Sequence, residues 1–405
     1  MPNAEHGRPV PAAAQRALRS GTLLTSFALL GAMAASAPAL ADRKTPTAPA
    51  FARVIESEVP EIMRTANIKG AAVGLVVDGE LVYAKGFGFA DHAGKIPVTP
   101  DTVFVAASLS KPIAAWVTLR LAKQGAITLD QHAADLVSPW PLAASTFDHR
   151  AITVRHLLSH TAGTSLGGYQ GWLDYKELPT LEESLAGKTN GRGAVELFAP
   201  AGSKFQYSGG GYTLLQLAIE RTTRRQYSDL ARELLFQPLG MKHSSIAMTP
   251  QIIASAAEGH GDDGSPVPMR YYVEQAPSTL TTTVNDFALW MRASMAAANG
   301  ERKSLLSRED VVDMYTPAAL TTAGAAGDAV YGLGHFIEKQ SDGSIAVGHD
   351  GRNQAGFRAK FLLRPQSRDG IVFFSNSRSG LALDRVVCLW AADASKADAE
   401  ASCKK

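Results

Sequence analysis

Ala71-Ala-Val-Gly-Leu-Val-Val77 is followed by Asp78-Gly79-Glu80 and then by Leu81-Val-Tyr-Ala-Lys-Gly-Phe-Gly88. Two apolar runs of strand length that are joined by Asp-Gly predict a β-hairpin, because both residues of that dipeptide tolerate the positive φ angles of a tight turn. We therefore expect an antiparallel pair of strands near the beginning of the chain.

Strand-like segments return near the other end of the chain. They are Tyr331–Glu338, Ile345–Gly348, Gly356–Leu363 and Gly370–Ser375. Between the two ends, roughly residues 129–270 mix helical segments with loops rich in Gly, Pro and Ser. The pattern predicts an α+β fold: an antiparallel sheet assembled from distant segments, flanked by N- and C-terminal helices at 51–66 and 381–392, plus a mainly helical lobe.

The amino-terminal segment 1–41 is typical of a secretory signal peptide. Arg8, Arg16 and Arg19 precede the apolar run Leu23–Ala35, and small residues predict cleavage after Ala41. An uncleaved membrane anchor is the alternative, although the run is shorter than the roughly 20 residues that span a bilayer. We expect a periplasmic or secreted protein with a linker at 42–50, one folded domain at 51–395 and a tail at 396–405.

Composition narrows the class of partner. The 405 residues carry 40 Lys and Arg against 38 Asp and Glu, and a formal charge of +2 favours neither nucleic acid nor a charged membrane surface. The expected partner is a small molecule or a short peptide. Two cysteines leave two interpretations open: Cys388 and Cys403 form a disulfide, as an oxidising compartment permits, or Cys388 simply packs in an apolar helix.

Ser108-Leu-Ser-Lys111 places a hydroxyl and an amine three positions apart, on one face of a helix. Helical spacing runs from Ser108 to Gln124, Gly125 is a typical stop, and Pro112 fits only the first turn. We therefore expect Ser108 at the amino end of the helix, where a lysine of lowered pKa can activate it. A capping Ser and a solvent-facing Lys are the ordinary alternative.

Two further polar clusters are rich in glycine. Tyr207-Ser208-Gly209 leads into a helical run, and its phenol can transfer protons to and from the Ser108 hydroxyl. His349-Asp350-Gly351-Arg352 follows a strand-like run, which puts polar side chains at a strand end. Taken alone, each has a plainer interpretation: a buried tyrosine with a satisfied hydroxyl, or a local hydrogen bond in a turn.

In this order, the three clusters resemble the penicillin-recognising serine hydrolases: class C β-lactamases, DD-peptidases, and the related esterases and D-aminopeptidases. The similarity spans about Phe51 to Ala392 and includes three further phrases, at Val154–Gly163, Phe236–Met241 and Tyr331–Gly334. The resemblance implies a two-lobed β-lactamase/transpeptidase-like fold, with no cofactor and no metal.

The resemblance also implies residue roles. Ser108 would be the nucleophile, and either Lys111 or Tyr207 the acylation base. The His349-Asp350-Gly351 stretch would take the strand position of the Lys-Thr-Gly motif of β-lactamases. The oxyanion hole would combine the N–H groups of Ser108 and Arg352. Substrate contacts would come from Ser208, Gly209, His349, Asp350, Gly351 and Arg352.

Two departures from the family bear on the substrate. Gly209 stands where class C β-lactamases have Asn, so a side-chain amide is missing. His349, largely neutral near pH 7, replaces a charged Lys, and Asp350 adds a negative charge. Whether the Arg352 side chain points toward the site and compensates that charge is left open by the sequence. These changes weaken the attraction for the carboxylate of β-lactams and peptidoglycan stems. We therefore expect an acyl-enzyme hydrolase of small esters or D-amino-acid amides and peptides.

Three other functions stay open. One is a true β-lactamase or DD-carboxypeptidase, and a second is a penicillin-binding sensor module that is acylated without turnover. The third is a metal hydrolase, since His149, His156 and His160 cluster in sequence. They do not form the H-E-x-x-H pattern of zinc peptidases, which argues against the third function.

Overall fold

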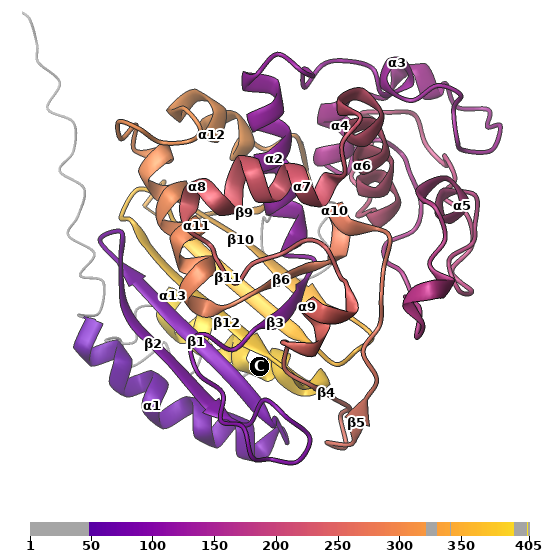
Figure 1. Cartoon of the computed structure of the whole chain (residues 1–405). Coiled ribbons are helices and arrows are strands. Elements are labelled where there is room, and N and C mark those ends of the chain that lie inside the picture. Colours follow the sequence, from indigo (N-terminus) through magenta and orange to yellow (C-terminus); the bar gives the residue numbers. More distant parts are fainter. Residues whose placement is uncertain (1–47, 321–329, 341, 393–402, 404–405) are drawn as a thin grey trace, which may run out of the picture. The chain divides into compact units, whose positions relative to one another are not determined.

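Figure 1 shows the computed structural model, which describes residues 48–320, 330–340, 342–392 and 403. The predicted signal peptide and most of the predicted linker and tail lie outside these residues. The described chain contains an eight-stranded antiparallel sheet in the order β2-β1-β12-β11-β10-β9-β8-β7. Its strands are β1 (Gly70–Val77), β2 (Glu80–Gly88), β7 (Ala319–Leu320), β8 (Val330–Tyr331), β9 (Phe336–Lys339), β10 (Ile345–Arg352), β11 (Arg358–Arg364) and β12 (Asp369–Ser375).

The β1–β2 hairpin has the predicted turn. Asp78 and Gly79 adopt φ angles of 51° and 78°, which the tight turn requires. β1 is continuously apolar because both of its faces are covered: Val76 enters one hydrophobic core and Leu75 the other. β2 is the edge strand, and its residues alternate between exposed and half-buried.

The sheet closes by pairing the two ends of the chain. β1 runs antiparallel to β12, with Ala71 opposite Ser375 and Val76 opposite Gly370. This confirms the predicted assembly from distant segments. The single strand predicted at Tyr331–Glu338 is wrong, because Gly334 at φ 78° turns the chain and separates β8 from β9.

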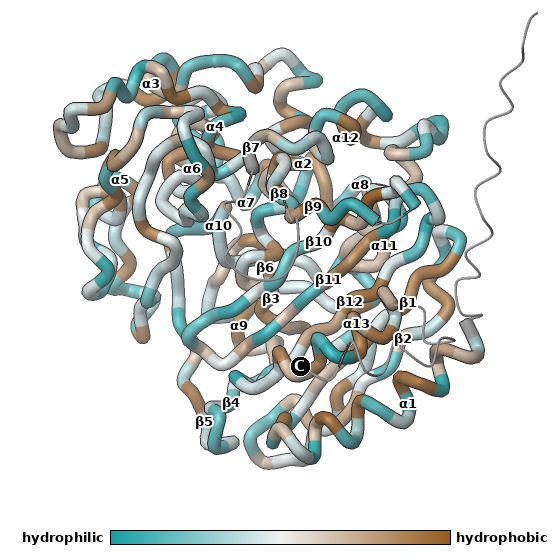
Figure 2. Tube along the Cα trace, turned by 180° about the vertical axis from the view of Figure 1, so that it is seen from behind, coloured by the Kyte–Doolittle hydropathy of each residue, from teal (hydrophilic) through white to brown (hydrophobic). Residues whose placement is uncertain are grey.

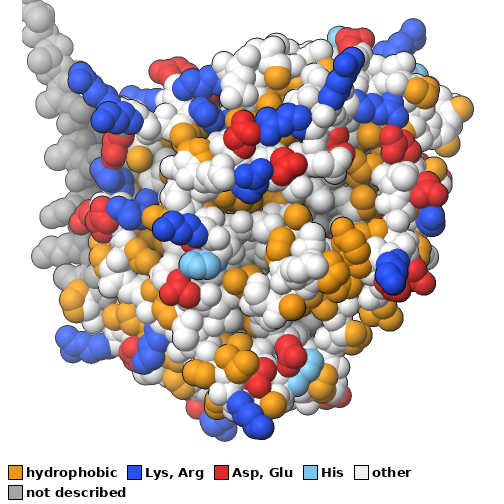
Figure 3. Space-filling view, in the orientation of Figure 1, with side chains coloured by type: hydrophobic (Ala, Val, Ile, Leu, Met, Phe, Trp, Pro, Cys, Tyr) orange, Lys and Arg blue, Asp and Glu red, His pale blue; other side chains and the backbone are white. Residues whose placement is uncertain are grey.

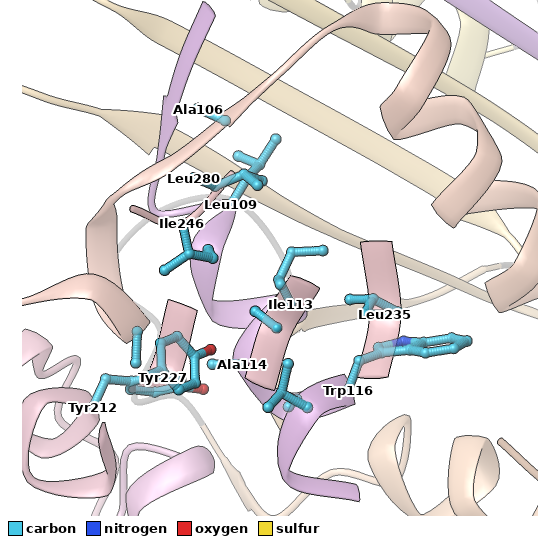
Figure 4. Packing of buried hydrophobic residues seen from close by; sticks show 14 of the residues in the cluster. Ala106, Leu109, Ile113, Ala114, Trp116, Tyr212, Tyr227, Leu235, Ile246 and Leu280 are labelled. Carbon is cyan, nitrogen blue, oxygen red and sulfur yellow. The ribbon is translucent and has the colours of Figure 1, made fainter. Parts of the chain in front are cut away.

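Helices cover both faces of the sheet. On one face lie α1 (Ala48–Thr65) and α13 (Asp384–Ala391), joined in one core with the strands. α1 already includes residues 48–50, which we had assigned to the linker, and Figure 2 shows hydrophobic and hydrophilic segments alternating along it. On the other face lie α2 (Ser110–Lys123) and α11 (Val284–Ala298). Figure 4 shows Ile113, Ala114 and Trp116 of α2 within this second core.

The middle of the chain forms the mainly helical lobe. Its helices are α3 (Ala133–Leu136), α4 (Val154–Leu158), α5 (Leu181–Leu185), α6 (Gly209–Thr223), α7 (Tyr227–Ala231), α8 (Gln237–Leu239) and α9 (Pro250–Ala254). Two small antiparallel pairs were not predicted. They are β3 (Phe104–Ala107) with β6 (Leu280–Thr282), and β4 (Gly259–His260) with β5 (Pro266–Val267).

A disulfide joins Cys388 of α13 to Cys403, which decides between the two interpretations of these cysteines. Among the described helices, none is long and apolar enough to cross a bilayer. On the face seen in Figure 3, acidic and basic side chains are interspersed, in keeping with the near-neutral formal charge.

Candidate active site

Ser108 lies in the turn that joins β3 to α2. Ala107 adopts the left-handed conformation at φ 51°, and the Lys111 N–H donates to the Ser108 carbonyl over 3.0 Å. The helix therefore begins at Ser110, two residues later than we predicted, although Pro112 still falls in its first turn. The Ser110 hydroxyl donates to the Ala107 carbonyl (2.6 Å) and accepts from the Leu280 N–H (2.8 Å), which holds β6 against this turn.

Lys111 is buried directly beside the Ser108 hydroxyl. Its Nζ lies 3.1 Å from Ser108 Oγ and donates to the Pro277 carbonyl over 3.0 Å. Burial lowers the pKa of Lys111 to about 7, although the negative charge of Asp350 opposes this shift. An amine with this pKa is largely neutral at mildly alkaline pH and can accept the serine proton.

Tyr207 brings its ring to the same lysine. Lys111 Nζ lies 4.7 Å from the centre of the Tyr207 ring. Desolvation raises the pKa of Tyr207 above its usual value, and hydrogen bonding with Ser108 opposes that rise. The phenol therefore stays protonated near pH 7. Ser108, Lys111 and Tyr207 thus lie together, as the sequence predicted.

His160 supports Tyr207 from behind, a role that the sequence analysis missed. The two rings are 4.4 Å apart, and His160 Nδ1 accepts from the Ser208 N–H over 3.0 Å. Burial holds the pKa of His160 well below its ordinary value, so the ring is neutral. The sequence contained one indication of this role, because His160 lies in the family-like segment Val154–Gly163. Residue spacing alone, however, did not connect that segment with Tyr207.

Ser208 and Gly209 have different environments. The Ser208 hydroxyl caps α6 by accepting from the Gly211 N–H (2.9 Å), and it donates to the Ser165 carbonyl (2.6 Å). We correct the expectation of a substrate contact, because these bonds use the hydroxyl within the protein. Gly209 lines the pocket, where a Cβ would lie 3.3 Å from both the Gly167 oxygen and the Tyr169 ring.

β10 places its residues on alternate faces of the sheet. His349 is buried, with Nε2 3.2 Å from the Tyr331 hydroxyl, and burial lowers its pKa to about 4. Gly351 packs against β3, since a Cβ there would lie 2.2 Å from the Ala106 oxygen. This contact brings the end of β10 beside the Ser108 turn.

Asp350 and Arg352 lie on the other side of the strand. Arg352 Nε is 2.8 Å from Asp350 Oδ2, so the two charges pair with each other. Burial opposes ionisation of Asp350, but the fields of His349 and Arg352 outweigh it and lower its pKa. The sequence left open whether Arg352 compensates the charge of Asp350, and the ion pair shows that it does.

A pocket of about 240 Å³ opens over Ser108. It is lined by Ser108, Lys111, Gly167, Gly168, Tyr169, Arg192, Gly209, Tyr272, Pro277, Ser278, Arg352, Asn353 and Gln354. Tyr169 and Tyr272 bring two aromatic rings to this lining. The loops that carry them meet through two backbone bonds between Trp172 and Tyr271, of 2.9 and 2.8 Å.

The three histidines that suggested a metal hydrolase have different environments. His149 stacks on Trp140 at 4.6 Å, His156 completes the cap of α4, and His160 contacts Tyr207. Across the described residues, no group of three or more His, Cys, Asp or Glu side chains is arranged to hold a metal ion.

The fold and this Ser-Lys-Tyr arrangement define a β-lactamase-like structure. The sequence profile of the Beta-lactamase family matches residues 55–393, and the chain belongs to this family. Membership agrees with the resemblance to the penicillin-recognising serine hydrolases, and an enzyme is the expected class of protein.

Individual relatives are distant. Penicillin-binding protein 4* of Bacillus subtilis is 24% identical over 330 residues, which are 76% of this chain and 68% of that protein. Protein flp of Staphylococcus aureus is 25% identical over 339 residues, 80% of this chain and 63% of its own length. The octameric penicillin-binding protein homologue from Pyrococcus abyssi has 25% identity and a TM-score of 0.70, with coverage of 84% of this chain and 77% of that one. The chain thus spans only part of the curated relatives.

Proposed function

We propose that this protein is a serine hydrolase that forms an acyl-enzyme on Ser108. The observation that carries the proposal is the 3.1 Å separation between Ser108 Oγ and the buried Lys111 Nζ. The lowered pKa of Lys111 and the raised pKa of Tyr207 favour the lysine as the acylation base.

The proposed reaction has two stages. Neutral Lys111 accepts the Ser108 proton while Oγ attacks the substrate carbonyl, and the N–H groups of Ser108 and Arg352 stabilise the oxyanion. The bond to the leaving group breaks, and Tyr207 relays the proton from Lys111 to that group. Water then attacks the acyl-enzyme, releases the acid and restores the serine.

The proposed substrate is a small ester or a D-amino-acid amide or peptide. Gly209 offers no side-chain amide to a substrate, and His349 is neutral because burial lowers its pKa to about 4. Class C β-lactamases have an Asn amide and a charged Lys at these two positions. Because this chain has neither group there, we expect weak β-lactam turnover. The second candidate is a true β-lactamase or DD-carboxypeptidase, or a sensor that stays acylated. It is favoured because one relative is named a penicillin-binding protein and one similar structure is a penicillin-binding protein homologue.

The proposed location is the periplasm or the extracellular medium. The sequence of residues 1–41 has the pattern of a signal peptide. The disulfide between Cys388 and Cys403 supports an oxidising compartment, since such bonds are rare in the cytosol.

Intact-mass spectrometry after brief exposure to a nitrophenyl ester or a penicillin tests the proposal. Wild type should gain the mass of one acyl group, and Ser108→Ala should gain none. An equal gain in both proteins would contradict Ser108 as nucleophile. Turnover of a chromogenic cephalosporin far above that of the ester and of a D-aminoacyl anilide would instead favour a β-lactamase. A penicillin adduct that persists for hours without ester turnover would favour the sensor.

A further inference from the structure

A second pocket adjoins the catalytic one and is lined by three arginines. It has a volume of about 340 Å³, and its walls are Arg352, Asn353, Gln354, Arg358 and Arg378. The first three of these residues also line the pocket over Ser108. The two pockets therefore share one wall, formed by the end of β10 and the start of the loop to β11.

The fold holds like charges together in this arginine pocket. Arg352, the last residue of β10, lies directly opposite Arg358, the first residue of β11. Like charges directly opposite each other destabilise a sheet. Burial, followed by the fields of Arg378 and Arg352, lowers the pKa of Arg358. The free protein therefore maintains an arrangement that an anion would stabilise.

The carboxylates nearby form an ion pair with only one of the three arginines of the pocket. Asp350 pairs with Arg352, while Arg358 donates instead to the carbonyls of Asn353 (3.1 Å) and Phe357 (2.8 Å).

The third arginine of the pocket is likewise bound to the backbone. Arg378 donates to the Gln354 carbonyl over 3.3 Å. Within the described part of the chain, neither Arg358 nor Arg378 forms an ion pair. Asp262 and Asp350 lie close enough for their fields to act on Arg358. The hydrogen bonds of Asp263 with Ser265, followed by the field of Arg378, lower the pKa of Asp263 without an ion pair between Asp263 and Arg378.

We propose that the arginine pocket binds a carboxylate carried by the substrate whose carbonyl lies at Ser108. A planar guanidinium matches a carboxylate through paired N–H groups. Because the wall at 352–354 separates the two pockets, the carboxylate belongs on a linker rather than next to the reacting carbonyl. This inference rests on the proposed function and names its substrate class: an ester or amide with a distal carboxylate.

Matched esters test this assignment. Nitrophenyl pentanoate and nitrophenyl hydrogen glutarate have acyl chains of the same length and differ in the terminal carboxylate. Phenyl acetate and carboxyphenyl acetate place the carboxylate on the leaving group instead. After subtraction of enzyme-free hydrolysis, we expect kcat/KM to favour the carboxylate in at least one pair by about tenfold, the effect of one charge-assisted hydrogen bond.

Variants connect that preference with the pocket. Arg378→Gln should bring the ratio of the two kcat/KM values toward one, and Arg378→Lys should retain part of the preference. The matched control is Arg225→Gln, which removes an exposed arginine that pairs with Glu233 in the helical lobe and should leave the ratio unchanged. Added salt should reduce the preference in wild type.

The outcomes separate this inference from the proposed function. Turnover of the neutral esters without a carboxylate preference, or with a preference that survives Arg378→Gln, overturns the arginine pocket and leaves the serine hydrolase standing. If no ester is turned over and Ser108 is not acylated, the hydrolase proposal fails. Calorimetric titration with glutarate then decides the pocket: binding that Arg378→Gln weakens about tenfold supports it, and no binding overturns it.

Discussion

At the scale of single residues, burial acts in opposite directions on the acid and the base of the site. It lowers the pKa of Lys111 to about 7 and that of His349 to about 4, and it raises the pKa of Tyr207. In each case the neutral form is favoured, because a low-dielectric environment disfavours charge. A neutral amine, imidazole and phenol thus meet in one site, and only the amine titrates near neutral pH.

The pH dependence of acylation follows from that lysine. Below pH 7 Lys111 is protonated and cannot accept a proton, so kcat/KM for a neutral ester should rise with pH and level off above about 7. Lys111→Arg, which stays charged, should lower kcat/KM by on the order of 10²–10⁴ and remove this limb. Steady-state kinetics between roughly pH 3 and 9 would measure both effects.

A different midpoint would contradict this assignment. A limb centred near 4 would point to His349, whose pKa lies there. A limb near 7 that survives Lys111→Arg would exclude Lys111 as its origin. Far-ultraviolet circular dichroism of the variant is the control for folding.

At the scale of elements, α2 is held from two sides by glycines. Gly351 of β10 packs on β3 just before Ser108, and Gly334 packs under the first turn of α2. At Gly334 a Cβ would lie 2.8 Å from the Lys111 oxygen and 3.0 Å from the Ala115 Cβ. The hairpin turn between β8 and β9 therefore limits how closely α2, which carries Lys111, approaches this part of the sheet.

Gly334→Ala should push α2 away from this turn. We expect kcat/KM to fall by on the order of tenfold or more, because small displacements of catalytic groups are costly. Gly125→Ala is the matched control: its φ of 74° is also positive, but nothing lies within 4 Å of the added Cβ. Equal loss of activity in the two variants would show that backbone strain, not packing against α2, is responsible. Ester kinetics and thermal unfolding of both proteins provide the comparison.

At the scale of the whole molecule, the disulfide ties Cys403 into the core that joins α1, α13 and the sheet. This core lies on the opposite face of the sheet from α2 and Ser108. Closing a loop of 15 residues is worth roughly 3 kcal/mol by chain entropy. The cross-link therefore stabilises the fold at a distance from the catalytic pocket.

Cys403→Ser should lower the free energy of unfolding by up to about 3 kcal/mol and leave ester kinetics unchanged. Denaturant unfolding with and without a reductant measures the effect, and the reductant should lower the stability of wild type but not of the variant. A loss of kcat/KM in the variant at temperatures where it is folded would contradict the separation of the two cores.

The sequence alone determined most strands at both ends of the chain, although not the break between β8 and β9, and it determined the order of the catalytic motifs. The Asp78-Gly79 turn and the apolar run of β1 are local signals, since turn geometry and strand burial depend on adjacent residues. Ser108 and Lys111 are three positions apart, so their contact was also local. Tyr207 was assigned to the same site only through the family resemblance, because no sequence periodicity connects residues so far apart.

Only the tertiary structure decided which charges share a pocket. From the sequence, Asp350 was expected to add a negative charge to the site, and only the structure shows that its ion pair with Arg352 compensates this charge. Arg358 and Arg378 lie on two later elements, and only strand register and the turn after β12 bring them beside Arg352. Charge interactions depend on distances across the fold, and a linear pattern carries no information about those distances.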